Sequence, residues 1–267
     1  MSYVRVEKPR PHVAVITMDR PERMNSMSFD LAMPLHGAFD EVAADNDVGC
    51  VILTGAGRGF CSGADTEDTE PPPNIEGLTL TRIATRAMSI LADLVPKMRR
   101  MPQPVICAVN GAAVGGGMCL SLGADIRLAG ESAYFRAAGI NNGLTATELG
   151  LSFLLPRAIG SSRAFEIALS GRDVGAAEAE RIGLVSRMVP DAELLPASLA
   201  LAEQINGWST QGVALTKRMM WSGLETGSLA AAIELESHTQ LYVRMTTRNF
   251  EEATRARREG RKPVFED

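Results

Sequence analysis

Two glycine-rich segments each follow a strand-like apolar run, and their residue types suit the binding of a carbonyl oxygen. The first covers residues 55–65 (GAGRGFCSGAD) and the second covers residues 109–117 (VNGAAVGGG). Glycine lets backbone N–H groups approach a ligand that side chains would hold away. Two such loops in one domain can direct two N–H donors at one carbonyl oxygen, which makes an oxyanion hole. The pair of loops therefore predicts a reaction through an anionic intermediate.

Strand-like and helical patterns locate the elements that would carry these loops. Short apolar runs predict strands over 12–18, 48–54, 105–109, 126–129 and 133–135, and a brief extended run over 184–189. Helical spacing predicts helices after a Ser28 cap, over 80–98, from Gly117 to a Gly123 C-cap, over 163–169 and 176–182, and three more between 194 and 258. Residues 1–11 are charged and lack an apolar run, and residues 66–77 have the composition of a surface loop.

The order of these elements predicts the fold class. Strands alternate with helices in the first part of the chain, and helices alone follow, which is typical of an α/β core with a helical appendage. We therefore expect a core over residues 1–195 and a helical region over residues 196–267. The length of 267 residues fits one large domain or a domain with a small addition.

Composition argues against several classes of partner. A formal net charge of −5 disfavours nucleic acid as the main partner. The four cysteines form no C-x-x-C pair and the three histidines have no metal-ligand spacing, so we expect no metal site. The apolar stretch 104–124 contains Asn110 and five glycines, which favours a loop and a buried strand over a membrane span. Unpaired cysteines without a signal peptide suggest the cytoplasm.

Ordered motifs along nearly the whole chain accompany the two loops. They lie at residues 19–27 (DRPERMNSM), 54–60 (TGAGRGF), 62–65 (SGAD), 108–111 (AVNG), 115–117 (GGG), 123–127 (GADIR), 155–157 (LPR), 159–160 (IG), 183–185 (GLV) and 261–265 (RKPVF). Together they resemble the crotonase superfamily, also called the enoyl-CoA hydratase/isomerase family. The resemblance implies a spiral of β-β-α units with a helical C-terminal trimerisation region. It also implies a trimer or a dimer of trimers.

The same resemblance implies an acyl-CoA thioester as the ligand, with CoA as part of the substrate and no separate cofactor. The family's oxyanion hole falls on the backbone N–H groups of Ala64 and Gly116, which would polarise the thioester carbonyl and stabilise an enolate. Loss of one such donor typically costs about 10²–10³ in rate. The residues that would border CoA are Arg23, Ala64, Asp65, Thr66, Glu67 and Gly116.

For some of these residues the sequence leaves a second interpretation open. Arg23 could reach a CoA phosphate or be an ordinary surface charge, and the same holds for Arg261 and Lys262 near the C-terminus. Asp65 follows the oxyanion alanine directly, where a structural role in the loop competes with proton transfer.

The chain departs from the family at both glutamates that hold and activate water in a hydratase. The first position is Cys119 and the second is Gly139. Neither residue can act as a carboxylate, and a buried thiol such as that expected of Cys119 is usually unreactive. Straightforward hydratase chemistry is therefore not expected, because the water has lost both of its holders.

One carboxylate remains where dienoyl-CoA isomerases of this family carry an acid. Alignment backwards from residues 155–157 places Glu148 there, whereas alignment forwards from Gly139 places Thr147 there; we prefer Glu148. A single carboxylate can move a proton between two carbons of an enolate, and an apolar pocket should raise its pKa. The competing interpretation is an acid at a helix N-terminus, with Thr145 or Thr147 as the cap.

Three functions follow from these residues. The favoured one is an enoyl-CoA or dienoyl-CoA isomerase that uses Glu148 alone. The second is an enoyl-CoA hydratase whose water is held by other groups, and the third is a non-catalytic acyl-CoA-binding protein. The intact oxyanion loops favour an enzyme, and the missing glutamates favour the binder.

Overall fold

The structure is a computed structural model that describes residues 2–67 and 70–266. Its larger sheet has six strands in the order β1-β2-β3-β5-β7-β10, and only the β1–β2 pair is antiparallel. These strands are β1 (Val4–Arg10), β2 (Val13–Met18), β3 (Cys50–Gly55), β5 (Val105–Val109), β7 (Ile126–Gly130) and β10 (Arg187–Val189).

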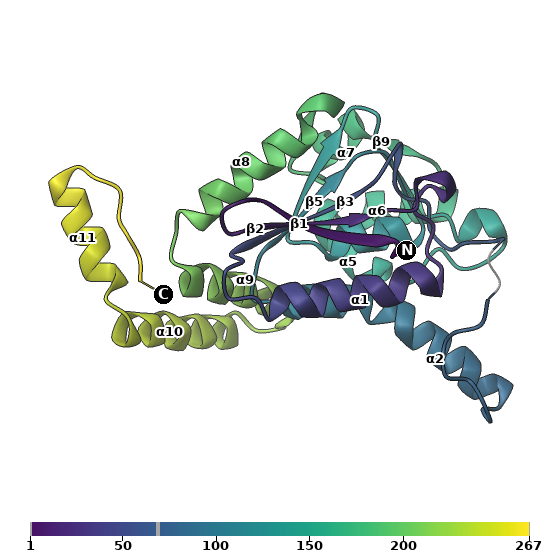
Figure 1. The fold of residues 1–267 in the computed structure, drawn as a ribbon, viewed down its shortest axis with the longest axis horizontal. Coiled ribbons are helices and arrows are strands. Elements are labelled where there is room, and N and C mark those ends of the chain that lie inside the picture. The colour runs from purple at the N-terminus through teal and green to yellow at the C-terminus, as the bar shows by residue number, and fades with distance from the viewer. Residues whose placement is uncertain (1, 68–69, 267) are drawn as a thin grey trace.

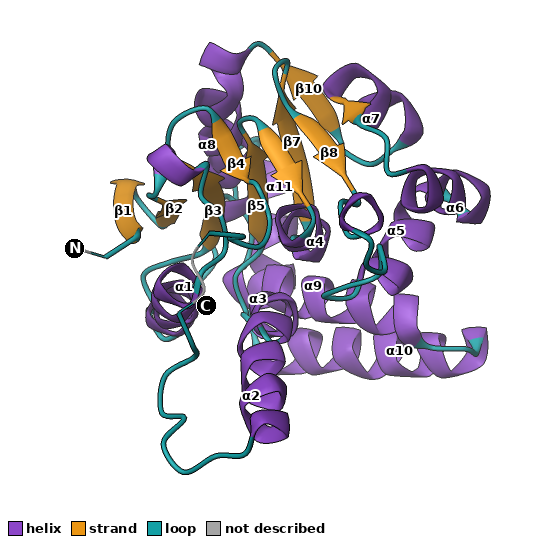
Figure 2. Cartoon of the chain, turned by 90° about the vertical axis from the view of Figure 1, so that its right-hand side faces the viewer, coloured by secondary structure: helices purple, strands orange, loops and turns teal. Residues whose placement is uncertain are grey.

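The second sheet is smaller and has the order β4-β6-β8-β9. Its strands are β4 (Gly59–Cys61), β6 (Ala112–Val114), β8 (Tyr134–Arg136) and β9 (Val174–Gly175). The chain adds a strand to the large sheet, then a strand to the small sheet, then one or more helices, and it repeats this order from β3, from β5 and from β7 (Figure 2). This repetition is the spiral of β-β-α units that the resemblance implies.

Helices cover the sheets and extend the chain beyond them. They are α1 (Phe29–Ala43), α2 (Leu80–Ala92), α3 (Leu94–Arg100), α4 (Gly116–Gly123), α5 (Leu151–Ile159), α6 (Ser161–Ser170), α7 (Ala176–Ile182), α8 (Leu194–Asn206), α9 (Thr210–Glu225), α10 (Leu229–Thr246) and α11 (Asn249–Glu259). Short 3₁₀ turns lie at η1 (Pro21–Arg23), η2 (Ile140–Asn142) and η3 (Asp191–Glu193).

The central strands are buried on both faces, which explains their continuous apolar sequences. In β2, Val13 and Val15 belong to a core cluster under α8, whereas Ala14 and Ile16 belong to the larger cluster on the opposite face. Helix α8 closes the first face through Ala202 and its neighbours, and it packs on β3, β5 and β7. The larger cluster continues into the second sheet, so the loops between the sheets rest on a fully packed core.

Helix α9 is fixed to the core by one buried ion pair. Lys217 Nζ lies 3.0 Å from Asp125 Oδ2 and donates to the carbonyl oxygens of Met98 and Gln103. Trp221 Nε1 donates to the other oxygen of Asp125 at 2.6 Å. Desolvation lowers the pKa of Lys217, and the charge of Asp125 opposes that effect.

Beyond α9 the chain leaves the sheets. Figure 1 shows α10 and α11 to one side of the molecule, and no residue of α10 is buried. Large apolar side chains on this helix face solvent in the single chain: Leu229, Ile233, Leu235, Leu241, Tyr242 and Met245. The division of the chain after residue 195 stays a prediction.

The helices differ from the expected ones in two places. The C-terminal region contains four helices instead of three. Ser209 and Ser228 cap α9 and α10 by accepting the N–H groups of Gly212 and Ala231, and α11 begins at Asn249 without a side-chain cap. The expected helix over 80–98 is two helices, α2 and α3. Pro96 has no N–H to donate to the carbonyl of residue 92, and it lies in the first turn of α3, where that N–H is not needed.

Two smaller expectations are also wrong, and strand β1 was not predicted. This strand forms over residues 4–10, where the sequence has no apolar run, because Val4 faces the core while charged residues between the apolar ones occupy the open edge. Gly123 is the last residue of α4 and not a left-handed cap; a Cβ there would lie 2.8 Å from Met98 Cε and 2.9 Å from Val95 Cγ1, so a larger residue would require these side chains to shift. The run over 184–189 is a strand only from Arg187, because Leu184 completes the turn after α7.

Candidate active site

The two glycine-rich loops emerge at the same edge of the second sheet. Strands β4 and β6 are parallel neighbours, with Gly59 opposite Ala112 and Cys61 opposite Ala113. The loops that follow them therefore run side by side, and Gly63 packs directly against Gly115.

A hydrogen bond to Met27 fixes the peptide that precedes Ala64. The Met27 N–H donates to the Gly63 carbonyl at 2.7 Å, and the Asp65 N–H donates to the Met27 carbonyl at 3.1 Å. Because the peptide is trans, the Ala64 N–H points away from the Gly63 carbonyl. It donates to no residue in the part of the chain that the structure describes, and Ala64 is exposed.

The Gly116 N–H is directed by the first turn of α4. The Gly115 carbonyl accepts the Cys119 N–H at 3.1 Å, so the Gly116 N–H points out of the helix N-terminus. This N–H also has no acceptor among the described residues, and the helix dipole adds positive potential there. The Met27 Cε fills the space next to Gly116 where a Cβ would project, so Met27 contacts both loops. The two predicted donors are therefore free to bind an oxygen.

The Glu148 carboxylate lies against the second of these loops. Its Oε1 is 3.0 Å from the point where a Cβ of Gly115 would lie, next to the predicted donor Gly116. Among the residues described, none donates a hydrogen bond to the carboxylate, and burial raises its pKa above the ordinary value of 4.5. Thr147, the alternative one residue earlier, is exposed.

The backbone around Glu148 is held from both sides. Its carbonyl accepts the Leu151 N–H at 2.8 Å and the Cys119 thiol at 3.3 Å. Leu149 has a left-handed φ of 44° and Gly150 follows with φ 92°. A non-glycine residue in this region costs on the order of 1–3 kcal/mol, which the surrounding contacts must offset.

The helix-capping interpretation of this segment is wrong. Helix α5 begins at Leu151 with Gly150 at the N-cap position, and no side chain caps it. The Thr145 hydroxyl donates instead to the Thr147 carbonyl at 3.4 Å. Glu148 therefore precedes the cap and is directed to the loops by the turn at Leu149.

Neither Cys119 nor Gly139 supplies a carboxylate or a reactive group. Cys119 is fully buried in α4, and desolvation is the main reason that its thiol pKa is raised. Gly139 lies at the start of η2 and has no side chain. Glu148 remains as a carboxylate that lies against the second loop without a hydrogen-bond donor among the described residues.

The predicted CoA-binding residues Arg23 and Asp65 are engaged with each other. Arg23 Nη2 lies 2.7 Å from Asp65 Oδ1, and its Nη1 pairs with Glu67. The Asp65 side chain is only 2% exposed and also binds Arg20 Nη1 at 2.6 Å and the Ser26 hydroxyl at 2.9 Å. This geometry favours the structural role for Asp65, as the anchor of the Ala64 loop.

Thr66 and Glu67 are exposed at the entrance to the following loop, where a ligand could contact them. Arg20, Ser26 and Met27 are site-supporting residues to which sequence reasoning assigned no role. They lie inside the motif at residues 19–27. The sequence of that motif does not reveal that its backbone pairs with the segment around Ala64, which is distant in the chain.

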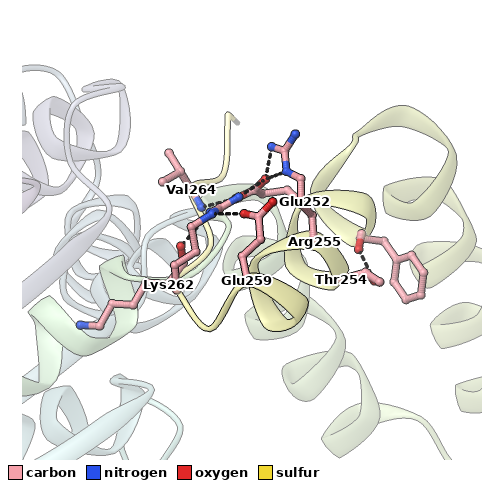
Figure 3. A network of polar contacts seen from close by, with 8 residues as sticks. Glu252, Thr254, Arg255, Glu259, Lys262 and Val264 are labelled. Carbon is pink, nitrogen blue, oxygen red and sulfur yellow. Dashed lines mark hydrogen bonds and ion pairs between the residues drawn. The ribbon is translucent and has the colours of Figure 1, made fainter.

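Arg261 near the C-terminus is tied to its own region. Its guanidinium binds Glu252 at 2.6 Å and Glu259 at 2.6 Å, within the network drawn in Figure 3. The hydrogen bond from Arg261 is the largest cause that lowers the pKa of Glu252 to about 2. Lys262 is exposed beside this network.

Metal-ligating clusters and membrane-spanning helices are both absent from the part of the chain that the structure describes. Over residues 2–67 and 70–266, no group of three or more His, Cys, Asp or Glu side chains could hold a metal ion. The helices in those ranges are too short or too polar to cross a membrane.

Comparisons with known proteins identify the family of the chain. The sequence model of the enoyl-CoA hydratase/isomerase family matches residues 9–267. A relative named "probable enoyl-CoA hydratase" in Mycobacterium bovis is 61% identical over 267 residues, which is 100% of this chain and 94% of that protein.

Two solved structures are similar over most of the chain. A probable enoyl-CoA hydratase/isomerase from Mycobacterium abscessus has a TM-score of 0.94 and 55% identity, and the match covers 99% of this chain and 98% of that one. A monofunctional enoyl-CoA isomerase from M. smegmatis has a TM-score of 0.75 and 52% identity, over 87% of this chain and 99% of that one. Sequence, fold and comparisons agree that the chain belongs to the enoyl-CoA hydratase/isomerase family, within the crotonase superfamily.

Proposed function

We propose that this chain is an enoyl-CoA or dienoyl-CoA isomerase in which Glu148 moves a proton between two carbons of the acyl group. The observation that carries the proposal is the half-buried Glu148 carboxylate beside Gly115, adjacent to the free N–H of Gly116. The similarity to a structure described as a monofunctional enoyl-CoA isomerase supports it.

The reaction uses the two backbone donors and one acid. The thioester oxygen accepts the N–H groups of Ala64 and Gly116, which makes the α-carbon more acidic and stabilises the enolate. Glu148 takes a proton from one carbon, the double bond shifts through the enolate, and Glu148 returns the proton to a different carbon. No water is consumed. A raised pKa suits this role because the carboxylic acid then holds the proton long enough to deliver it.

The substrate proposal extends to binding and assembly. CoA enters as part of the substrate, so no separate cofactor is required, and a cytoplasmic location fits the chemistry. The exposed apolar side chains of α10 support self-association as a trimer or a dimer of trimers.

A hydratase is the second candidate, and the name of the M. bovis relative favours it. Hydration needs a water molecule held and activated beside the double bond. Cys119 and Gly139 offer no carboxylate for that purpose, so Glu148 alone would have to do the work of two acids. A non-catalytic acyl-CoA binder is the third candidate, which the free backbone donors disfavour.

A product assay separates the three. Purified protein is incubated with crotonyl-CoA, a 3-enoyl-CoA and a 3,5-dienoyl-CoA, and products are resolved by chromatography and mass. We expect isomerised product without a gain in mass, and its loss in Glu148→Gln but not in Glu180→Gln, a change at an exposed glutamate of α7. Unchanged turnover in Glu148→Gln contradicts the proposal, and a gain of one water supports the hydratase.

A further inference from the structure

The space beside Gly139 is filled by backbone. A Cβ atom added to Gly139 would overlap the carbonyl oxygen of Thr145 and lie 2.8 Å from its carbonyl carbon and 3.2 Å from the Cα of Ala146. Separations below 3.0 Å are ones that real Cβ atoms essentially never show. The chain at 145–146 therefore occupies the place from which any side chain at position 139 would start.

This same segment leads directly to Glu148. Its far end is held where the Cys119 thiol donates to the Glu148 carbonyl at 3.3 Å. The two positions that lack the family's water-holding glutamates, 119 and 139, thus both contact the segment that carries the remaining acid. A longer side chain at either position would project into that segment.

The turn at Gly139 cannot easily move aside. The Gly139 carbonyl accepts the N–H groups of Asn142 at 3.1 Å and Leu144 at 2.9 Å, which closes η2 tightly. Asn141 Nδ2 ties the turn to the carbonyl of Gly171 at the end of α6. A new side chain at position 139 would accordingly displace the Thr145 backbone and not the turn itself.

We propose that Gly139 is a specificity-determining residue: its bare backbone admits the 145–148 segment that brings Glu148 to the oxyanion loops. In this chain, therefore, Glu148 can reach the loops only when positions 119 and 139 do not carry glutamates. The one-acid and two-glutamate arrangements exclude each other. The inference rests on the proposed function, because it assumes that Glu148 is the acid.

The first test is Gly139→Ala, which adds only the overlapping Cβ. Gly37→Ala is the matched control, since Gly37 is exposed in α1 and a Cβ there meets nothing within 4 Å. We expect Gly139→Ala to lose isomerase turnover on the order of 10²-fold, the typical effect of a misplacement of about 1 Å at a reacting group. Binding of the acyl-CoA should change by less than about threefold, because both backbone donors remain.

Alkylation of the Cys119 thiol tests the inference independently of enzyme turnover. Movement of the 145–148 segment should uncover the Cys119 thiol, so its alkylation by N-ethylmaleimide, followed by peptide mass spectrometry, should be faster in Gly139→Ala than in Gly37→Ala. Cys50 and Cys107 are buried in β3 and β5 and report global unfolding. Faster labelling at Cys119 with Cys50 and Cys107 unchanged supports the inference.

A second pair of variants covers the case in which Gly139→Ala does not fold. Cys119→Ser keeps a donor to the Glu148 carbonyl, and Cys119→Ala removes the donor at a volume close to that of serine. We expect wild-type turnover within about threefold for serine and a larger loss for alanine, since a buried acceptor loses a partner. Equal turnover in the two variants counts against the inference.

The double variant Cys119→Glu/Gly139→Glu tests directly whether the two-glutamate arrangement and the Glu148 arrangement exclude each other. We expect it to lose isomerisation without gaining hydration of crotonyl-CoA. Hydration together with wild-type isomerisation overturns the inference, as does a fully active Gly139→Ala with a protected Cys119. Retained turnover in Glu148→Gln, by contrast, overturns the proposed function, whatever the thiol labelling shows.

Discussion

The anchor of the Ala64 loop gives a prediction whose size follows from burial. Arg20 Nη1 and Asp65 Oδ2 are 2.6 Å apart, with side chains 10% and 2% exposed. Breaking such a pair by removing one charge costs about 3–5 kcal/mol, because the remaining charge stays desolvated. Asp65→Asn keeps the shape and removes only the charge, so we expect a loss of unfolding free energy in that range.

Asp19→Asn is the matched control. Arg5 Nε and Asp19 Oδ2 are also 2.6 Å apart, but their side chains are 48% and 30% exposed. An exposed pair contributes about 0–1 kcal/mol, because water solvates each charge when the other is removed. The two ion pairs have the same N···O distance, so the difference between the stability losses of the two variants reports the effect of burial.

Urea unfolding followed by circular dichroism measures both variants. At about 2–4 °C per kcal/mol for a chain of this size, Asp65→Asn should also unfold about 6–20 °C lower. Turnover should fall as well, since Asp65 holds the loop that carries the Ala64 donor. If Asp65→Asn costs no more than Asp19→Asn, the argument from burial is refuted and the Ala64 loop is held by its backbone alone.

Three further predictions concern other parts of the molecule. Because burial raises the pKa of Glu148, the folded state favours its protonated form; this stabilisation is present below pH 4.5 and is lost as the pH rises through the raised pKa. Glu148→Gln should therefore raise the melting temperature at pH 7 but not at pH 4. In the parent protein, the acid limb of the kcat/KM profile should lie above pH 4.5. An acid limb at or below pH 4.5 would contradict a pKa raised by burial. Lys217→Met leaves the Asp125 carboxylate without its cation and should cost about 3–5 kcal/mol. It should also speed cleavage after the exposed Trp208 between α8 and α9, which limited chymotrypsin digestion would show. Ile233→Asp together with Met245→Asp should shift the protein to monomer in analytical ultracentrifugation, and an unchanged sedimentation coefficient would exclude α10 as the contact surface.

Local apolar patterns were sufficient for much of the fold. The parallel strands β2, β3 and β5 are buried on both faces, so their continuous Val, Ile and Leu runs were readable. Strand β1 has no such run, because at the edge of the sheet its charged residues can face solvent. The break between α2 and α3 at Pro96 was open to prediction from proline chemistry, whereas the serine caps of α9 and α10 were obscured by continuous helical spacing.

Some features of the candidate site could likewise be predicted from the sequence, whereas others depend on the folded chain. Ala64, Gly116 and Glu148 were placed from motifs in the sequence, and their catalytic roles stay predictions. The contacts of Met27 with both loops depend on chain segments that meet only in the folded protein. At Gly139 the sequence revealed a missing carboxylate but not that the Thr145 backbone fills its place, since that proximity depends on the path of the loop.

Because of the position of Met27, the spacing of the two predicted donors and the fit of the acyl group depend on different parts of the chain. Its backbone orients one predicted donor and its side chain packs on the other, so the spacing between the donors is fixed by a segment outside both glycine-rich loops. We expect the rest of a ligand to contact other surfaces, α2 among them. Variation there would then change which acyl group fits, while the spacing of the two predicted donors stays the same.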